Sequence, residues 1–262
     1  MILSPYNAGL EILDAHGGGV HPSRRTKVAI VAFGPTWTAV QAVQTDPDWE
    51  IWGLNCGYRH PSMYHEAVID QGAVVGYQLA IHPPQTAERN SSLTFRREFR
   101  CDRWFEIHEM RVQPADDLEW LTRCPIPVYL HELDPRVPNG VRLPIERLEA
   151  MVPGLPPTWA STFAYQVAMA MLEGFETIAL YGCDFSSPRE WLCERPNLLF
   201  WVGLAMGRGI EVQIPAESTL LAHPYRYGLE YDREAIWSDQ RVASAVHDWL
   251  PALAPRCVER IA

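Results

Sequence analysis

Two carboxylates, a histidine and an arginine have the side-chain chemistry that catalysis would need. His108 follows an apolar segment, where an imidazole could act as a general base or orient a phosphate. Glu190 and Glu194 fall at the expected start of a later helix, and a carboxylate there could accept a proton from an acceptor hydroxyl. Arg195 follows directly and could offset the charge of a phosphate. The alternatives are a hydrogen-bonded structural histidine, compensation of charge at a helix end, and a surface arginine.

Other ionisable residues stand near strand ends but predict no metal centre. Glu106, His131 and Glu132 accompany His108 there, yet their positions do not fall at the paired spacings of metal ligands. The D-x-D sequence at 46–48 precedes its strand, so we interpret it as a turn. Six cysteines at 56, 101, 124, 183, 193 and 257 form no C-x-x-C pair, which favours buried reduced thiols and a cytoplasmic protein.

A second set of polar residues has the types that hold a nucleotide. Gly34, Pro35 and Thr36 follow the apolar run 27–33; glycine permits close backbone approach, and amides at the start of the next helix can hold an anion. Asn55 ends the run 49–54, where its amide could bond a base or sugar. Taken alone, the Gly34-Pro35-Thr36 triplet and Asn55 are each more typical of an ordinary turn than of a ligand site. Neither a G-x-G-x-x-G fingerprint nor a Walker motif occurs in the chain.

The most informative segment spans residues 157–185. Ser161 and Thr162 stand at an N-cap before an Ala- and Met-rich helix, which Gly174 ends. The apolar run 177–181 predicts a strand covered on both faces, and Asp184 lies just beyond it. Because ligands of open α/β sheets bind at the carboxyl ends of strands, a helix start and a strand end meet here at one expected site.

Strands alternate with helices along the chain, which predicts an α/β fold: a doubly wound, mostly parallel, Rossmann-like sheet with helices on both faces. We expect strands at 27–33, 49–54, 103–108, 127–130, 177–181 and 210–214, and helices near 36–44, 118–122, 162–173 and 196–207. Residues 1–25 read as an N-terminal arm, 26–230 as a single nucleotide-binding domain, and 231–262 as a C-terminal helix and tail. Residues 60–100, with one strand-like run at 73–81, are interpreted as an insertion or a lid facing the substrate.

Composition limits the partners of the protein. A hydrophobic share of 47% in 262 residues supports a sizeable core, and no apolar run reaches the roughly 20 residues of a membrane span. The N-terminus lacks the pattern of a secretory signal. The net charge of −10 argues against tight non-specific binding of nucleic acid. Arg96, Arg97, Arg100 and Arg103 form the one basic run, for which a solvated face is the favoured interpretation.

In their order, these motifs resemble those of bacterial lipooligosaccharide sialyltransferases and of the related hydroxymethylpterin pyrophosphokinase-like proteins. The matching pieces are Gly34-Pro35-Thr36, Asn55, Ser161-Thr162-Phe163, Gly174-Phe175, 181–185 and 218–221. The strings WEIWGLN, RWFEIH and ERPN are also similar to uncharacterised phage-encoded proteins. The chain departs from the family at several positions: Ala32 and Phe163 replace glycines, Ser186 replaces an aromatic, and the family's general-base histidine aligns with Trp191 or Leu192.

The resemblance implies a metal-independent glycosyltransferase that needs no cofactor and moves a sugar from a nucleotide-sugar donor to an acceptor hydroxyl. It implies nucleotide binding by the following residues: Gly34, Pro35, Thr36, Asn55, Ser161, Thr162, Asp184 and Ser186. Glu190 would be the base, with Glu194 or His108 as alternatives, and Arg195 would stabilise the leaving phosphate. The acceptor could be a glycan or, in a phage, a hydroxymethylated DNA base. A magnesium-dependent pyrophosphoryl or nucleotidyl transferase, with Asp184 as a metal ligand, and a non-catalytic nucleotide-binding module are the alternatives.

Overall fold

The computed structural model describes residues 25–79, 93–154, 159–185, 187 and 190–221, together with two short paired strands, β1 (Ile12–Leu13) and β2 (Gly19–Val20). The predicted C-terminal helix, most of the predicted arm, Cys257 and Ser186 lie outside the described residues. Within the described part, no helix combines the length and the apolar character that crossing a bilayer requires.

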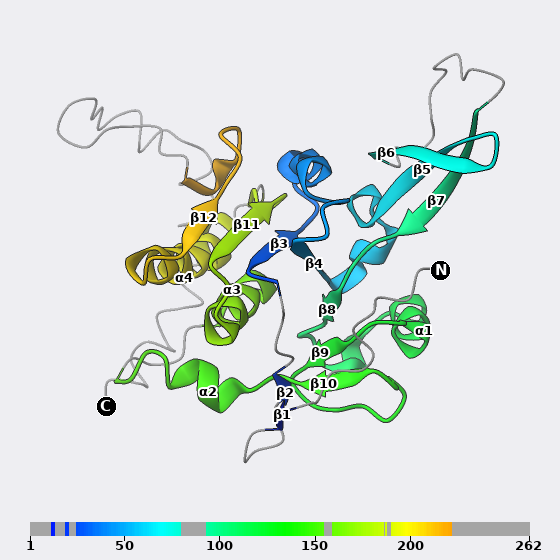
Figure 1. Ribbon diagram of the computed structural model, residues 1–262. Coiled ribbons are helices and arrows are strands. Elements are labelled where there is room, and N and C mark those ends of the chain that lie inside the picture. Colours follow the sequence, from blue (N-terminus) through cyan, green and yellow to red (C-terminus); the bar gives the residue numbers. More distant parts are fainter. Residues whose placement is uncertain are drawn as a thin grey trace.

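A seven-stranded sheet, parallel throughout, forms the centre of the molecule in the order β10-β9-β8-β4-β3-β11-β12 (Figure 1). Its strands are β3 (Lys27–Val31), β4 (Trp49–Leu54), β8 (Arg103–Phe105), β9 (Val128–Leu130), β10 (Gly140–Arg142), β11 (Thr177–Tyr181) and β12 (Glu211–Gln213). The predicted α/β class with a parallel, doubly wound sheet is therefore confirmed. The edge strand β10 was not predicted.

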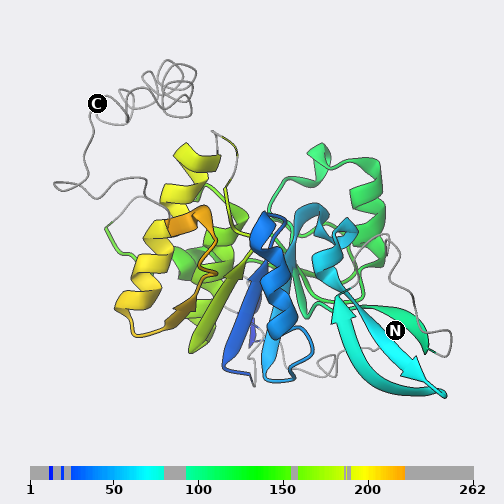
Figure 2. The same cartoon turned by 90° about the horizontal axis from the view of Figure 1, so that it is seen from above.

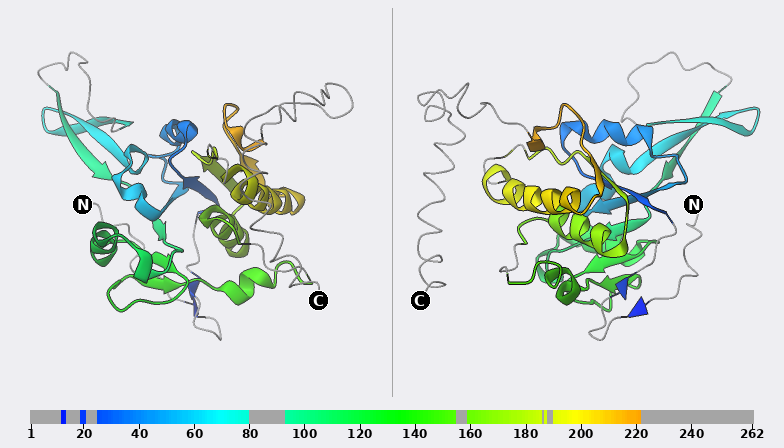
Figure 3. Two further views of the ribbon diagram at one scale, coloured as in Figure 1. Left: turned by 180° about the vertical axis from the view of Figure 1, so that it is seen from behind. Right: turned by 60° about the vertical axis from the view of Figure 1, so that its left-hand side comes forward.

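Apolar residues alternate along the strands and build one core on each face of the sheet. In β3, Val28 and Ile30 face one core, and Ala29 and Val31 face the other. The first core is covered by α2 (Ile145–Glu149), α3 (Thr162–Glu173) and α4 (Arg195–Gly207). The second is covered by the 3-10 helix η1 (Pro35–Ala42) and by α1 (Ala115–Arg123). Figure 3 shows α3 and α4 on one side of the sheet and η1 on the opposite side.

Helix α3 begins and ends as its sequence predicts. The Ser161 hydroxyl accepts a hydrogen bond from the Ala164 amide at 3.4 Å, which satisfies one free donor of the first turn. Gly174 ends the helix in the left-handed conformation (φ 82°), which costs glycine nothing. Before α4, residues Glu190–Glu194 form one π-helical turn, η5. The remaining 3-10 helices in the described part of the chain are η2 (Asn55–Arg59), η3 (Pro61–Met63), η4 (Met110–Val112) and η6 (Thr219–Leu221).

Residues 60–100 contain an antiparallel sheet of three strands where the sequence predicted a single strand. The strands are β5 (Tyr64–Asp70), β6 (Ala73–Leu79) and β7 (Leu93–Phe99), in the order β6-β5-β7. Gln71 and Gly72 both have positive φ (48° and 84°), as a tight two-residue hairpin turn requires. Figure 2 shows this sheet projecting from the side of the parallel sheet. The predicted insertion is thus a β-sheet, and a role as lid stays a prediction.

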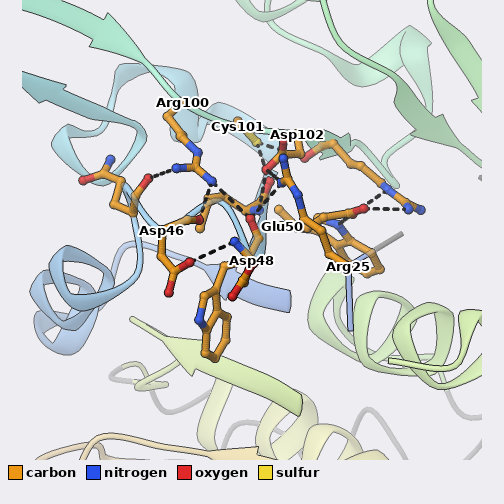
Figure 4. A network of polar contacts seen from close by, with 12 residues as sticks. Arg25, Asp46, Asp48, Glu50, Arg100, Cys101 and Asp102 are labelled. Carbon is orange, nitrogen blue, oxygen red and sulfur yellow. Dashed lines mark hydrogen bonds and ion pairs between the residues drawn. The ribbon is translucent and has the colours of Figure 1, made fainter. Parts of the chain in front are cut away.

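The basic run is only partly solvated, so that part of the prediction was wrong. Arg96 and Arg97 are exposed. Arg100 instead is half-buried and donates to the carbonyl oxygens of Gln44, Asp46 and Trp49 (Figure 4). Arg25 joins this network through Asp102, at 3.1 Å. Arg103 is 4% exposed and takes part in a buried ion-pair cluster.

The cysteines follow the prediction at three of the described positions. Cys101, Cys124 and Cys183 are buried free thiols, and burial raises the pKa of each. The prediction was wrong for Cys56, which is exposed, and for Cys193, which is half-buried. The D-x-D sequence forms a turn as predicted, because the Asp48 amide donates to the Asp46 carboxylate at 2.8 Å.

Candidate active site at the carboxyl edge

The order of the strands reverses between β3 and β11, and this switch point is where open α/β sheets offer a crevice to ligands. Here the segments that follow β3 and β11 stay in contact with each other beyond the strand ends. The Ala32 amide donates to the Tyr181 carbonyl at 2.8 Å, and the Gly34 amide donates to the Gly182 carbonyl at 2.9 Å. A Cβ on Gly34 would lie 2.6 Å from an oxygen of Asp184. The close approach that Gly34 permits is therefore an approach to Asp184.

Asp184 is held by Thr36 across this switch point. The Thr36 amide donates to Oδ2 at 2.7 Å, and the Thr36 hydroxyl lies 2.9 Å from both carboxylate oxygens. That hydroxyl also accepts from the Gly182 amide at 3.1 Å. Asp184 is 4% exposed, and its carbonyl accepts from the Thr219 hydroxyl. Thr36 and Asp184, both predicted to bind the nucleotide, thus bond each other and brace η1 against the end of β11.

A second group of predicted nucleotide-binding residues meets where β4 ends and α3 begins. The Thr162 hydroxyl lies 3.5 Å from Asn55 Oδ1, although the two residues are far apart in sequence. Asn55 has a positive φ of 48°, a conformation that asparagine tolerates better than most residues. Next to them stands Ser161, the N-cap of α3. The structure therefore brings together Asn55, Ser161 and Thr162 at the predicted edge.

His108 is paired with a buried carboxylate at the neighbouring strand end. Glu106 follows β8 and is 2% exposed; its Oε1 lies 2.6 Å from His108 Nδ1 and accepts from the His108 amide at 3.2 Å. The His108 side chain is 57% exposed. The hydrogen bond to Glu106 raises the pKa of His108, burial opposes this, and the charges of Glu106 and Glu194 raise it further. Because the carboxylate fixes the proton on Nδ1, the neutral ring presents Nε2 as a proton acceptor.

The other three predicted catalytic residues have different surroundings. Glu190 accepts from the Ser187 amide at 2.9 Å and donates its own amide to the Ser187 hydroxyl at 3.2 Å, which is the reciprocal pattern of a capping box. Arg195 is 6% exposed, donates to the Leu220 carbonyl at 2.8 Å and lies 4.1 Å from the centre of the Trp191 ring. Glu194 lies close enough to His108 for its charge to raise the histidine pKa. These contacts favour His108 over Glu190 as base.

An open groove of about 790 Å³ lies beside this pair, over the ends of β8 and β9. It is lined by Ile107, His108, Glu109, Met110, Arg111, Leu130, His131, Glu132, Leu133, Asp134 and Arg136. His131 packs edge-on against Tyr165 of α3 at 5.0 Å between ring centres, and burial lowers the pKa of this histidine. Acidic and basic side chains are mixed along the lining, so a neutral polar ligand fits its charge better than a polyanion.

Glu106 stands near a predicted strand end, but its position alone predicts no role for it. Its signal was the E-x-H spacing directly after a strand, which lets a carboxylate bond the imidazole two residues on. Within the described residues, no three His, Cys, Asp or Glu side chains are grouped so that they could hold a metal ion.

Comparison with known proteins gives a distant structural likeness. No protein-family model and no curated protein matches this sequence. The monofunctional α-2,3-sialyltransferase Cst-I from Campylobacter jejuni is similar in structure, with 10% identity and a TM-score of 0.46, over 86% of this chain and 96% of that one. The sialyltransferase CstII from the same organism, in complex with the substrate analogue cytidine-5'-monophosphate, has 13% identity and a TM-score of 0.42, over 76% of this chain and 83% of that one. These values describe a likeness of fold and assign no activity.

Proposed function

We propose that the protein is a glycosyltransferase that uses a nucleotide-sugar donor and His108 as its general base. One observation carries this proposal: a buried carboxylate, Glu106, holds an exposed imidazole at the carboxyl edge of a parallel sheet, beside an open groove. Such an edge is the usual ligand site of this fold class, and a carboxylate-supported histidine is the usual means of removing a hydroxyl proton.

The proton transfer follows from the geometry of the pair. His108 Nε2 accepts the proton of the acceptor hydroxyl while the hydroxyl oxygen bonds to the anomeric carbon of the donor sugar. The bond from that carbon to the phosphate oxygen breaks, and its electron pair leaves with the nucleotide. Glu106 stabilises the imidazolium that forms, because its Oε1 already accepts from Nδ1 at 2.6 Å. Glu194 adds a second negative charge near the same ring.

The donor nucleotide binds at the adjacent strand ends in this proposal. Asn55 and Thr162 offer an amide and a hydroxyl, and the first amides of α3 point toward the same edge, where they can bond phosphate oxygens. The turn at Gly34 and Pro35 forms the neighbouring wall. Thr36 and Asp184 act as a brace that fixes this wall, and Arg195 anchors η6 to α4. The proposal also includes a contact of Ser186 with the nucleotide, which is predicted from the sequence alone.

The acceptor binds in the groove beside His108 and presents a hydroxyl to Nε2. A glycan and a hydroxymethylated base of phage DNA both offer such a hydroxyl. The groove places Glu109, Glu132 and Asp134 beside Arg111 and Arg136, and the net charge of the protein is −10, so the overall charge disfavours a phosphate-rich duplex. The glycan is therefore the acceptor that we favour.

Donor turnover tests the proposal directly. The protein is mixed with a panel of nucleotide sugars, in EDTA and in magnesium, with hydroxyl-bearing glycans as acceptors, and release of the nucleotide is measured. We expect release from one donor in EDTA and a fall of about 10²- to 10⁴-fold in His108→Ala. Binding and turnover of a nucleoside triphosphate with strict dependence on magnesium would instead support pyrophosphoryl or nucleotidyl transfer. Binding of nucleotides without any turnover would support a non-catalytic module.

A further inference from the structure

Three aromatic side chains gather where β3 and β4 end: Phe33, Trp37 and His60, which we call the aromatic group. The ring centres of Phe33 and His60 are 5.7 Å apart, and those of Trp37 and His60 are 5.0 Å apart, with edge-to-face geometry. Phe33 and Trp37 flank the Gly34-Pro35-Thr36 turn in sequence, and His60 directly follows η2, which begins at Asn55. The aromatic group therefore adjoins two of the elements to which we assign nucleotide binding.

Phe33 is fixed in place and yet exposed. A Cβ on Gly57 would lie 2.7 Å from Phe33 Cε1, so the ring rests against a backbone position that has no side chain. His60 contacts it from another side. Even so, Phe33 is 37% exposed. An apolar ring that is packed on two sides and left open at the carboxyl edge has the properties of a stacking surface, because packing on two sides reduces the side-chain entropy that is lost when a ligand covers it.

His60 is fixed in one tautomer by its hydrogen bonds. Its Nδ1 accepts from the Ser62 amide at 3.2 Å and lies 2.8 Å from the Ser62 hydroxyl. Since the amide can only donate, Nδ1 carries no proton and Nε2 bears the N–H of the ring. Burial lowers the pKa of His60, which keeps the ring neutral near pH 7. His60 is thus a neutral, oriented N–H donor held against the exposed Phe33 ring.

We propose that the aromatic group is the nucleobase subsite of the donor: Phe33 stacks on the base, and His60 Nε2–H donates to a ring nitrogen or carbonyl oxygen of that base. This inference rests on the proposed function, which requires a nucleotide at this edge. Every nucleobase has a face that can stack and an acceptor atom on its rim, so both contacts recognise the base rather than the sugar or the phosphate.

Calorimetric titration of nucleoside monophosphates and ribose 5-phosphate tests the subsite. The four monophosphates of cytidine, uridine, adenosine and guanosine are titrated into the wild type, Phe33→Ala, Phe33→Leu and Phe200→Ala. Phe200 is the matched control, because it is 38% exposed but lies on α4. We expect both Phe33 variants to bind the preferred monophosphate about fivefold to a hundredfold more weakly. The affinity of the Phe33 variants for ribose 5-phosphate should equal that of the wild type. The affinity of Phe200→Ala for the preferred monophosphate should also equal that of the wild type.

The substitution His60→Asn tests the hydrogen-bond donor of His60 separately from the contribution of His60 to folding. His60 is the N-cap of η3, and asparagine is a strong N-cap that keeps an acceptor for the Ser62 amide while removing the Nε2–H donor. We expect its melting temperature to stay near that of the wild type and its affinity for the preferred monophosphate to fall about threefold to tenfold.

Two results would contradict the proposed base subsite. One leaves the proposed function standing, and the other contradicts both. If the wild type binds monophosphates and the Phe33 and His60 variants bind them equally well, the aromatic group is not the base subsite, although the proposed function stands. If the wild type binds neither nucleotides nor nucleotide sugars, the subsite and the proposed function fail together.

Discussion

Strand β8 begins at the charged residue Arg103 and is followed directly by the charged residue Glu106, and the two side chains have different surroundings. At its start, Arg103 lies 2.9 Å from an oxygen of Glu50 and 2.7 Å from an oxygen of Glu173, and all three side chains are at most 5% exposed. After its end, Glu106 is just as buried, but its partner His108 is 57% exposed.

This difference in exposure distinguishes the ion-pair cluster around Arg103, which is structural, from the pair of Glu106 and His108, which can react with a substrate. Arg103 also donates to the Tyr129 hydroxyl at 3.1 Å, and the Trp52 indole donates to Glu50, so the arginine is surrounded by protein groups. Burial by itself would lower the pKa of Arg103, but the charges and hydrogen bonds around it hold that pKa above its ordinary value, so the arginine stays protonated. Glu106 instead directs one ring nitrogen of His108 inward and leaves the other ring nitrogen for a substrate proton.

The largest effect that we expect is the loss of activity in His108→Ala. Removal of the base should lower kcat/KM for sugar transfer by about 10²- to 10⁴-fold, because the acceptor hydroxyl must then lose its proton to water. Steady-state kinetics with the identified donor measures this. His131→Ala is the control in the same groove and should lose less than tenfold. Equal losses in the two variants would mean that His108 has no special role.

At the other end of β8, Arg103→Met should affect stability. The substitution leaves the carboxylates of Glu50 and Glu173 buried without the arginine, which destabilises proteins by about 3–5 kcal/mol. Urea unfolding followed by circular dichroism measures the change. The control Arg123→Met removes an arginine from an exposed ion pair with Glu119 and should change the free energy of unfolding by less than about 1 kcal/mol. A small change in Arg103→Met would show that the cluster does not stabilise the fold.

The substitution Thr36→Val tests whether Thr36, a polar residue at the carboxyl edge, stabilises the fold rather than contacting a ligand. It removes the hydroxyl that bonds Asp184 and should lower the free energy of unfolding by about 1–3 kcal/mol. Thr122→Val, which removes a half-exposed hydroxyl from a helix, should stay within about 0.5 kcal/mol of the wild type. Unchanged stability combined with lost nucleotide binding would reassign Thr36 from the brace to direct contact with the ligand.

Elements of the fold whose sequence signals act within a few residues were predictable. The bounds of α3 and β11 follow from a serine cap, a left-handed glycine and an apolar run, each of which acts within a few residues. Strand β10 has three residues, too few for a period to be recognised. Strands β5 and β7 alternate polar and apolar residues weakly, and their pairing is set by contacts across the chain.

The candidate site shows the same limit. Sequence placed Asn55, Thr162 and Asp184 at one edge, because parallel strands all end there. It could not show that Asp184 is already bonded by Thr36, which lies 148 residues away. His60 and Glu106 escaped assignment although each has its partner two residues on, because such short spacings are also common in ordinary turns.

The pH dependence of kcat/KM in the wild type and in Glu106→Gln tests the central claim most directly. The base acts when His108 is neutral, and Glu106 raises the pKa of His108, so wild-type activity should rise with pH through a midpoint above about 6.5. In Glu106→Gln the carboxylate charge is gone, so the midpoint should move to lower pH while the maximal rate falls. In His108→Ala this limb should disappear. A wild-type midpoint that both substitutions leave unchanged would contradict the assignment of Glu106 and His108 as the catalytic pair.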